Sequence, residues 1–143
     1  MRFWDSSALV PLLVPEAMSR SLQGLYKTDP VMVAWWATEI ECTSAIARRQ
    51  RLGQLREAIV IEAFVRLSAL RAGWHEVEPG EDVREAAKRL VRVHDLRTAD
   101  ALQLAAALFV AEARPSTLEF VSLDDRLVAA ARREGFSTTL PTP

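Results

Sequence analysis

Four acidic residues stand where predicted strands end or predicted helices begin. Asp5 ends a short apolar segment at the N-terminus, and Asp124 follows the apolar segment 118–121. Glu41 and Asp100 lie in the first turns of two predicted helices. Ligands of parallel α/β sheets bind beyond the carboxyl ends of the strands. The four carboxylates could therefore converge on one pocket.

Four carboxylates in one pocket would need a positive partner. Bare, they would repel one another and raise each other's pKa values. One or two divalent cations would neutralise them, and Mg²⁺ or Mn²⁺ prefers carboxylate oxygens and water. Such a site activates water as a nucleophile and stabilises charge that develops on a phosphoryl group. The chemistry that the acids suggest is the hydrolysis of a phosphodiester.

Each acid also has a structural explanation. Asp5 could cap a turn, and Asp100 could complement the N-terminus of its helix, which favours negative charge by about 0.3–1 kcal/mol. Residues 38–41 and 122–125 fit the capping-box pattern, in which an acidic side chain reaches back to a backbone N–H. It is less convincing that all four acids are purely structural than that any one of them is, because Asp5 and Asp100 interrupt strongly apolar surroundings.

The helix predicted over residues 96–110 gives the strongest reason to expect a functional role for one of the acids, Asp100. Residues 99–111 have almost no polar face, which is typical of a buried helix, and Thr98 could cap its start. Asp100 would then lie in nearly dry surroundings, where a carboxylate must be paired, hydrogen-bonded or bound to a metal.

Predicted strands and helices alternate along the whole chain. Apolar segments predict strands at 2–5, 31–34, 74–78, 118–121 and 136–140. Spacing and helix-start signals predict helices at 8–14, 15–26, 35–49, 54–72, 81–93, 96–110 and 122–134. Ser6 or Ser7 could cap the first helix, and Pro15 suits the first position of the second. The alternation predicts one α/β domain over residues 1–143, with a parallel sheet covered by helices.

Composition narrows the class of protein. The 143 residues are half hydrophobic and a quarter charged, as in soluble globular domains. No apolar run approaches the roughly 20 residues of a membrane span, and the N-terminus lacks the features of a signal peptide, so we expect a cytoplasmic protein. Cys42 is the only cysteine and there are two histidines, so oxygen atoms would have to hold any metal. The net charge of −1 argues against broad adhesion to nucleic acid, but allows a local basic rim.

Four segments resemble, in order, the motifs of a known family. They are residues 3–10 (FWDSSALV), 41–48 (ECTSAIAR), 96–105 (LRTADALQLA) and 120–127 (FVSLDDRL). Each motif alone is weak, but four in this order and spacing are fairly specific. The chain resembles the PIN-domain ribonucleases, specifically the VapC-type toxins of bacterial toxin–antitoxin pairs. The resemblance implies a three-layer α/β/α sandwich with a mostly parallel central sheet of about four to five short strands.

The resemblance also implies that the four acids bind the metal. Periodicity alone does not choose between Glu41 and Glu39, which face different ways on a helix. The family pattern favours Glu41, because small residues and an Ala-Ile pair follow it at residues 44–46. The same pattern favours Asp124 over its neighbour Asp125.

Three further residues are assigned supporting roles. Ser7 matches a hydroxyl that supports the site beside the first aspartate. Ser122 keeps a hydroxyl where the family more often has threonine. Arg97 could contact a substrate phosphate, pair with Glu41 or lie in solvent.

The resemblance implies an endoribonuclease that depends on Mg²⁺ or Mn²⁺, inhibits translation, forms a homodimer and is neutralised by an antitoxin. We expect antitoxin contact on the helical hairpin 41–72, because of its exposed position and apolar stripe. Two alternatives stay open: a PIN-like binding module without catalysis, and a phosphatase with Asp5 as a covalent nucleophile. Such a phosphatase usually has a second aspartate two residues on, where this chain has Ser7.

The remaining candidates have ordinary structural explanations. The arginines within residues 48–51 could complement a helix C-terminus or contact RNA. One of Trp35 and Trp36 is expected in the core, and the other could stack on a base or a partner. His94 and Cys42 are interpreted as structural residues.

Overall fold

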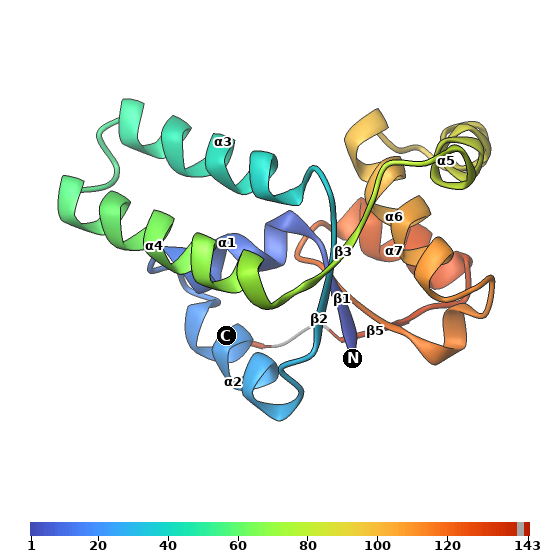
Figure 1. Ribbon diagram of the computed structural model, residues 1–143, viewed down its shortest axis with the longest axis horizontal. Helices are drawn as coiled ribbons and strands as arrows, with labels where there is room; N and C mark the ends of the chain where they lie inside the picture. Colours follow the sequence, from blue (N-terminus) through green and yellow to red (C-terminus); the bar gives the residue numbers. More distant parts are fainter. Residues whose placement is uncertain (140–141) are drawn as a thin grey trace.

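A parallel sheet of five short strands runs between two groups of helices (Figure 1). The structure, a computed structural model, describes residues 1–139 and 142–143. The strands lie in the order β3 (His75–Val77), β2 (Met32–Trp35), β1 (Arg2–Trp4), β4 (Glu119–Val121) and β5 (Ser137–Thr138). Each neighbouring pair of strands is parallel. The parallel sheet predicted from the sequence is therefore confirmed.

Strand β1 lies at the centre of the sheet and defines where a ligand would bind. Arg2 pairs with Met32 of β2 on one side and with Glu119 of β4 on the other. The chain therefore builds outward from β1 through β2 to β3, and then returns to add β4 and β5 on the opposite side. The crevice at the carboxyl ends of β1 and β4 is the topological switch point, where open α/β sheets bind their ligands.

Helices cover both faces of the sheet. One face carries α1 (Ser6–Leu13), α2 (Ser19–Thr28), α3 (Thr38–Arg51) and α4 (Glu57–Gly73), and the other carries α5 (Glu81–Val93), α6 (Thr98–Val110) and α7 (Asp125–Arg133) (Figure 1). A 3₁₀ turn, Pro115–Thr117, precedes β4. Successive strand residues point to opposite faces: Trp4 packs with the first group and Phe3 with the second. The predicted α/β/α sandwich is confirmed.

Helix α6 is buried, as its composition predicted. Ala101, Leu104 and Ala105 are inaccessible to solvent, while Phe109 near the end of the helix is exposed. The prediction that Thr98 caps this helix is wrong. Thr98 is already helical, and Arg97, at the N-cap position, makes no side-chain capping bond.

The starts of α2, α4 and α7 were also predicted too early, and α7 begins at Asp125 rather than at residue 122. Helix α2 begins at Ser19 rather than Pro15, because the Ser19 hydroxyl accepts a hydrogen bond from the Glu16 backbone N–H and holds a turn ahead of the helix. Helix α4 begins three residues later than predicted, at Glu57. The errors at α2 and α4 come from turns that helical periodicity does not reveal.

The helix expected from residue 35 begins at Thr38, because Trp35 pairs with Val77 and completes β2. Trp35 is buried and Trp36 exposed, which selects Trp35 as the core tryptophan. The strand predicted at 136–140 is represented by Ser137–Thr138, and residue 140 lies outside the described residues. Within the described part of the chain, no helix is both long and apolar enough to cross a bilayer.

Candidate active site

Asp5 lies at the switch point, directly after β1. Its backbone N–H donates to the carbonyl of Val121 in β4 at 3.0 Å, which extends the pairing of the two strands by one step. Its carboxylate caps α1 by accepting a bond from the Ser7 N–H, so neither Ser6 nor Ser7 is the cap predicted from the sequence. The turn-cap explanation of Asp5 is thus correct in part, and further contacts show that capping is not its whole environment.

Two serines hold one oxygen of the buried Asp5 carboxylate. The hydroxyl groups of Ser7 and Ser122 donate to Oδ2 at 2.5 and 2.9 Å, and their oxygens lie 3.2 Å apart. Burial is the main cause that raises the pKa of Asp5 above its ordinary value; the charge of Asp124 adds to the rise, and the serine hydrogen bonds oppose it. The structure therefore places Ser7 and Ser122 against Asp5, where the resemblance expects supporting hydroxyls.

The same serines fix the loop that carries Asp124. The Leu123 N–H donates to Ser7 Oγ at 2.9 Å, and the Asp124 N–H donates to Ser122 Oγ at 3.0 Å. Asp124 caps α7 through Oδ1, which accepts from the Leu127 N–H at 3.0 Å. The capping box predicted for residues 122–125 is wrong, because Asp124 is the cap. Its Oδ1 serves the helix and leaves Oδ2 for another partner.

Glu41 approaches from α3 on the other side of Asp5. Ser6 Oγ donates to its Oε2 at 2.9 Å, and Gln103 Nε2 donates to its Oε1 at 3.1 Å. Burial raises the pKa of Glu41, the charges of Asp5 and Asp100 raise it further, and the two hydrogen bonds oppose the rise. The carboxylate is therefore held among the other acids.

The capping box predicted for residues 38–41 is also wrong. Thr38 lies inside α3, and its hydroxyl accepts a bond from Gln103 Nε2 at 3.0 Å instead of bonding a free N–H at the helix start. Glu39 instead pairs with Arg71 at 3.1 Å. Glu41 is therefore the glutamate of α3 that lies near Asp5 and Asp100.

Asp100 lines an open cleft at the start of α6. The cleft has a volume of about 500 Å³, and its walls are formed by Arg97, Ala99, Asp100, Asp124, Asp125 and Arg126. Burial is the main cause that raises the pKa of Asp100, followed by the charges of Asp124 and Asp5, while Arg97 and Arg126 lower it. In the described part of the chain, no ion pair joins Arg97 to Glu41.

The four predicted acids thus meet at one end of the sheet. Each raised pKa, that of Asp5, Glu41 or Asp100, includes a contribution from the charge of another acid. Among residues 1–139 and 142–143, no group of three or more Asp, Glu, His or Cys side chains is arranged closely enough to hold a metal ion as it stands. The donor set is nonetheless made of carboxylate oxygens that repel one another, which is the set that Mg²⁺ or Mn²⁺ suits. The chemistry of the donor set, rather than a completed ligand shell, is what suits a hard divalent cation.

Two side chains that donate hydrogen bonds to Glu41 were not predicted as site residues. Ser6 was considered only as a helix cap, and Gln103 only as part of an apolar helix. A signal for Gln103 exists in the sequence, because it is a polar residue within an apolar stretch and lies three positions after Asp100. On a helix, side chains three apart lie on the same face.

The other candidates lie away from the acids. His94 Nε2 lies 2.8 Å from Glu134 Oε2, which supports a structural role for His94. Cys42 is buried in the core, and burial raises the pKa of its thiol to about 12. The arginines within residues 48–51 are at the opposite end of α3 from Glu41, and Arg49 bonds Glu16.

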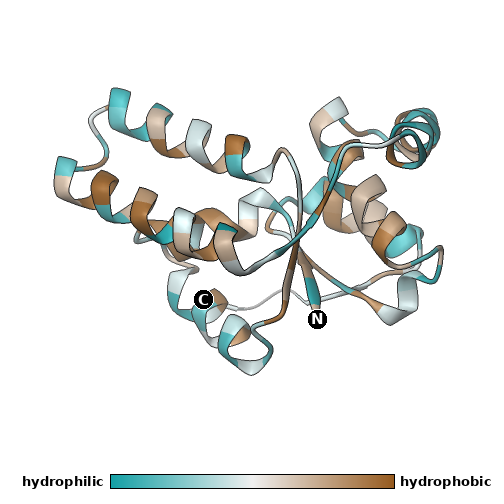
Figure 2. Ribbon diagram, in the orientation of Figure 1, coloured by the Kyte–Doolittle hydropathy of each residue, from teal (hydrophilic) through white to brown (hydrophobic). Residues whose placement is uncertain are grey.

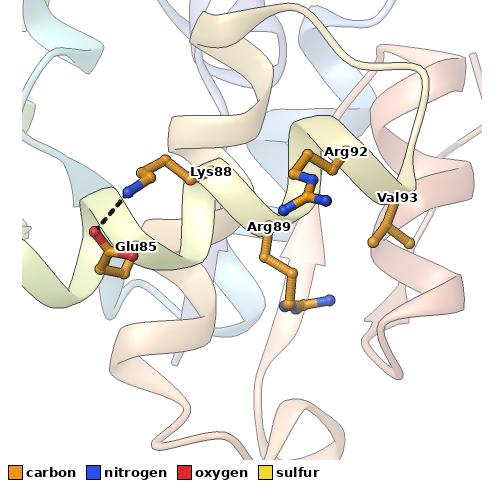
Figure 3. A pocket seen from close by; sticks show the side chains of 5 residues that line it. All are labelled: Glu85, Lys88, Arg89, Arg92 and Val93. Carbon is orange, nitrogen blue, oxygen red and sulfur yellow. Dashed lines mark hydrogen bonds and ion pairs between the residues drawn. The ribbon is translucent and has the colours of Figure 1, made fainter.

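A second hollow, on the surface of α5, has basic walls (Figure 3). Its volume is about 490 Å³, and it is lined by Glu85, Lys88, Arg89, Arg92 and Val93. Lys88 pairs with Glu85 at 2.9 Å, and Arg89 bonds Glu134 at 2.5 Å. Two of its cations are thus already paired, and the acid cleft remains the better candidate for chemistry.

Comparison with solved structures identifies the fold. No family model matches the sequence, and no curated protein is significantly similar to it. Mycobacterium tuberculosis VapC20, a toxin that cleaves the sarcin–ricin loop, is 22% identical with a TM-score of 0.68, over 99% of this chain and 100% of that one. The chain has the VapC fold. A Klebsiella pneumoniae toxin–antitoxin complex contains a similar chain, 18% identical with a TM-score of 0.67, covering 99% of this chain and 98% of the other.

FitAcB from Neisseria gonorrhoeae shares the VapC fold as well, at 15% identity and a TM-score of 0.66, covering 99% of this chain and 98% of that one. These matches span nearly the whole length of the described chain. The resemblance found in the sequence is therefore confirmed at the level of the fold. Fold alone does not establish an activity, which has to be argued from the site.

Proposed function

We propose that this chain is an endoribonuclease dependent on Mg²⁺ or Mn²⁺ and the toxin of a toxin–antitoxin pair, inhibiting translation through RNA cleavage. The observation that carries the proposal is the meeting of Asp5, Glu41, Asp100 and Asp124 at the switch point of a VapC fold. RNA is the substrate class to test first, because the structural neighbour VapC20 cleaves the sarcin–ricin loop.

The four acids would hold the cation. When bound, Mg²⁺ or Mn²⁺ supplies the positive charge that activates water and stabilises charge on the phosphodiester. The chain's own contribution is to fix the acids in place. Ser7 and Ser122 donate hydrogen bonds to Asp5, and Ser6 and Gln103 donate to Glu41.

Arg97 and Arg126 give the cleft a basic side. Both line it with Asp100 and Asp124, and both are solvent-exposed. An RNA phosphate entering an acidic cleft meets repulsion, and guanidinium groups beside it offset this while donating two parallel hydrogen bonds. We assign Arg97 and Arg126 to the phosphates that flank the cleaved bond.

The α3–α4 hairpin, made of helices α3 and α4 and the turn between them, is the proposed antitoxin surface. It extends away from the sheet (Figure 1), and apolar side chains are exposed on both helices, among them Ile40, Ile61 and Val65. The start of α3 also carries Glu41, so a protein bound along the hairpin would reach the entrance of the site. We further expect a homodimer, as the resemblance implies.

The proposal is tested by incubating purified protein with tRNA, rRNA and mRNA in Mg²⁺, in Mn²⁺ and in EDTA. We expect cleavage in either metal and none in EDTA. Asp5→Asn should abolish cleavage, because asparagine keeps the capping bond but loses the charge. Glu39→Gln is the matched control, because it neutralises another acid of α3, one that pairs with Arg71. This variant should cleave RNA as wild type does.

Cleavage that persists in EDTA or in Asp5→Asn would overturn the metal mechanism. Protein that binds RNA without metal and without cleaving it would indicate a binding module. A phosphorylated aspartate trapped at Asp5 would indicate the phosphatase instead.

A further inference from the structure

Gln103 is a polar residue in an unusual place. It lies in the middle of α6 and is inaccessible to solvent, with leucine and alanine side chains before and after it on the helix. Burying an amide costs free energy unless its hydrogen bonds are made. A methionine or leucine would fill the same space without that cost, so the amide calls for a reason.

Both N–H groups of the Gln103 amide are used, and both reach α3. Nε2 donates to Thr38 Oγ1 at 3.0 Å and to Glu41 Oε1 at 3.1 Å. Its carbonyl oxygen Oε1 is buried and has no hydrogen-bond partner in the described part of the chain. Native proteins seldom leave a buried polar atom unpaired. The amide thus commits both of its donors to α3, one of them to Glu41.

The second oxygen of Glu41 is held from a different helix. Ser6, at the start of α1, donates to Oε2 at 2.9 Å and also lies 3.5 Å from Asp5 Oδ1. The Glu41 carboxylate therefore has one donor on each oxygen, from α1 and from α6. A glutamate side chain rotates about three bonds, and two such donors restrict it to one orientation.

We propose that Gln103 is a positioning residue, which with Ser6 fixes the Glu41 carboxylate toward Asp5 and Asp100 for cation binding. This inference rests on the proposed function. Gln103 and Asp100 are three residues apart on α6, so one helix face presents both a carboxylate and the amide that orients another. Removal of a group that orients a metal ligand typically lowers metal affinity by about 10- to 100-fold.

The test compares Gln103→Met with Thr38→Val. Methionine has a similar length but no donor, whereas Thr38→Val removes the other acceptor of the same amide and leaves its bond to Glu41. Mn²⁺ binding is measured by calorimetry, the Mg²⁺ concentration for half-maximal RNA cleavage by titration, and folding by thermal unfolding in EDTA. Gln103→Met should weaken Mn²⁺ binding and raise the Mg²⁺ requirement about tenfold, and Thr38→Val should change both less than twofold.

A purely structural role predicts another outcome. If the amide only joins α6 to α3, both variants lower the melting temperature and leave Mn²⁺ binding as in wild type. That result would overturn the inference while the wild-type protein still cleaved RNA. Equal losses of Mn²⁺ affinity in both variants would overturn it as well.

A readout without metal separates this inference from the proposed function. The side-chain amide protons of Gln103 are followed by NMR in EDTA, in wild type and in Glu41→Ala. Loss of the charged acceptor should shift one of them upfield, and no shift would contradict the contact. If the shift between wild type and Glu41→Ala is seen, but the wild-type protein neither binds Mn²⁺ nor cleaves RNA, the contact is present without a cation site. That result would refute the cation site, and with it the role assigned to Gln103.

Discussion

Asp124 and Asp125 are adjacent acids, and only Asp124 is placed to serve both the helix and the site. Asp124→Asn should keep the cap of α7, because asparagine caps as well as aspartate. It should lower metal-dependent cleavage by more than the roughly 10- to 100-fold that outer groups of metal sites contribute. Asp125, exposed at the edge of the cleft, is the matched control.

Cleavage rates at saturating RNA and melting temperatures in EDTA distinguish the two effects. We expect Asp125→Asn to match wild type in both. If Asp125→Asn lost cleavage and Asp124→Asn did not, the assignment of the ligand would be reversed.

At the residue scale, the sequence predicted the acids better than their partners. Asp5, Asp100 and Asp124 could be found because each stands beside an apolar segment. The bond between Gln103 and Glu41 joins residues 62 positions apart, and it depends on how closely α6 approaches α3. Such an approach is decided by packing, which local patterns do not contain.

At the element scale, Glu134 joins the C-terminal ends of α5 and α7. Its carboxylate accepts from Arg89 at 2.5 Å and lies 2.8 Å from His94 Nε2. The hydrogen bond from Arg89 is the main cause that holds the pKa of Glu134 below its ordinary value. The contact stabilises the fold above the pKa of an unfolded glutamate, about 4.3, and this is lost as the pH falls through the lower folded value.

Glu134→Gln should therefore lower the melting temperature at pH 7 by roughly 4 °C, for a loss of about 1 kcal/mol, a value kept small because Arg89 is half exposed. The difference in melting temperature between wild type and Glu134→Gln should shrink as the pH falls below about 4. Thermal unfolding between pH 3 and 7 measures it. The acids of the cleft titrate in both proteins and cancel. A difference that stayed constant with pH would contradict the linkage.

Helices were predicted well where apolar residues repeat at helical spacing over many residues. The ends of helices were predicted less well. Residues 81–93 were predicted with the bounds that α5 has, because its apolar positions repeat regularly. The start of α2 was missed, because the turn held by Ser19 satisfies backbone groups that a helix would otherwise use. Turn bonds of this kind compete locally with helix formation.

At the scale of the whole molecule, the sequence predicted a parallel sheet but not its strand order. The order places β1 between β2 and β4, and this brings Asp5 and Asp124 together, although they are far apart in the chain. Pairing between distant segments depends on the whole chain. The acids could therefore be expected to converge, but the strand order that makes them converge is visible only in the folded molecule.

The two helical layers each expose apolar side chains, one on the α3–α4 hairpin and the other on α5. Hydrophobic segments recur along α4 in the α3–α4 hairpin (Figure 2), where Ile61 and Val65 are exposed. Val93 is equally exposed on α5, in the opposite layer. Single glutamate substitutions at exposed positions should leave stability nearly unchanged.

Ile61→Glu and Val65→Glu should each weaken binding of the proposed antitoxin at least about tenfold, because a charge then has to be buried in an apolar contact. Val93→Glu should bind as wild type. Affinities are measured by calorimetry in the Asp5→Asn background, which avoids RNA cleavage during expression. Since the start of the hairpin carries Glu41, weaker antitoxin binding should also restore RNA cleavage in the Asp5-containing protein mixed with antitoxin. Hairpin variants that bound antitoxin as tightly as Val93→Glu would place the antitoxin on another face of the molecule.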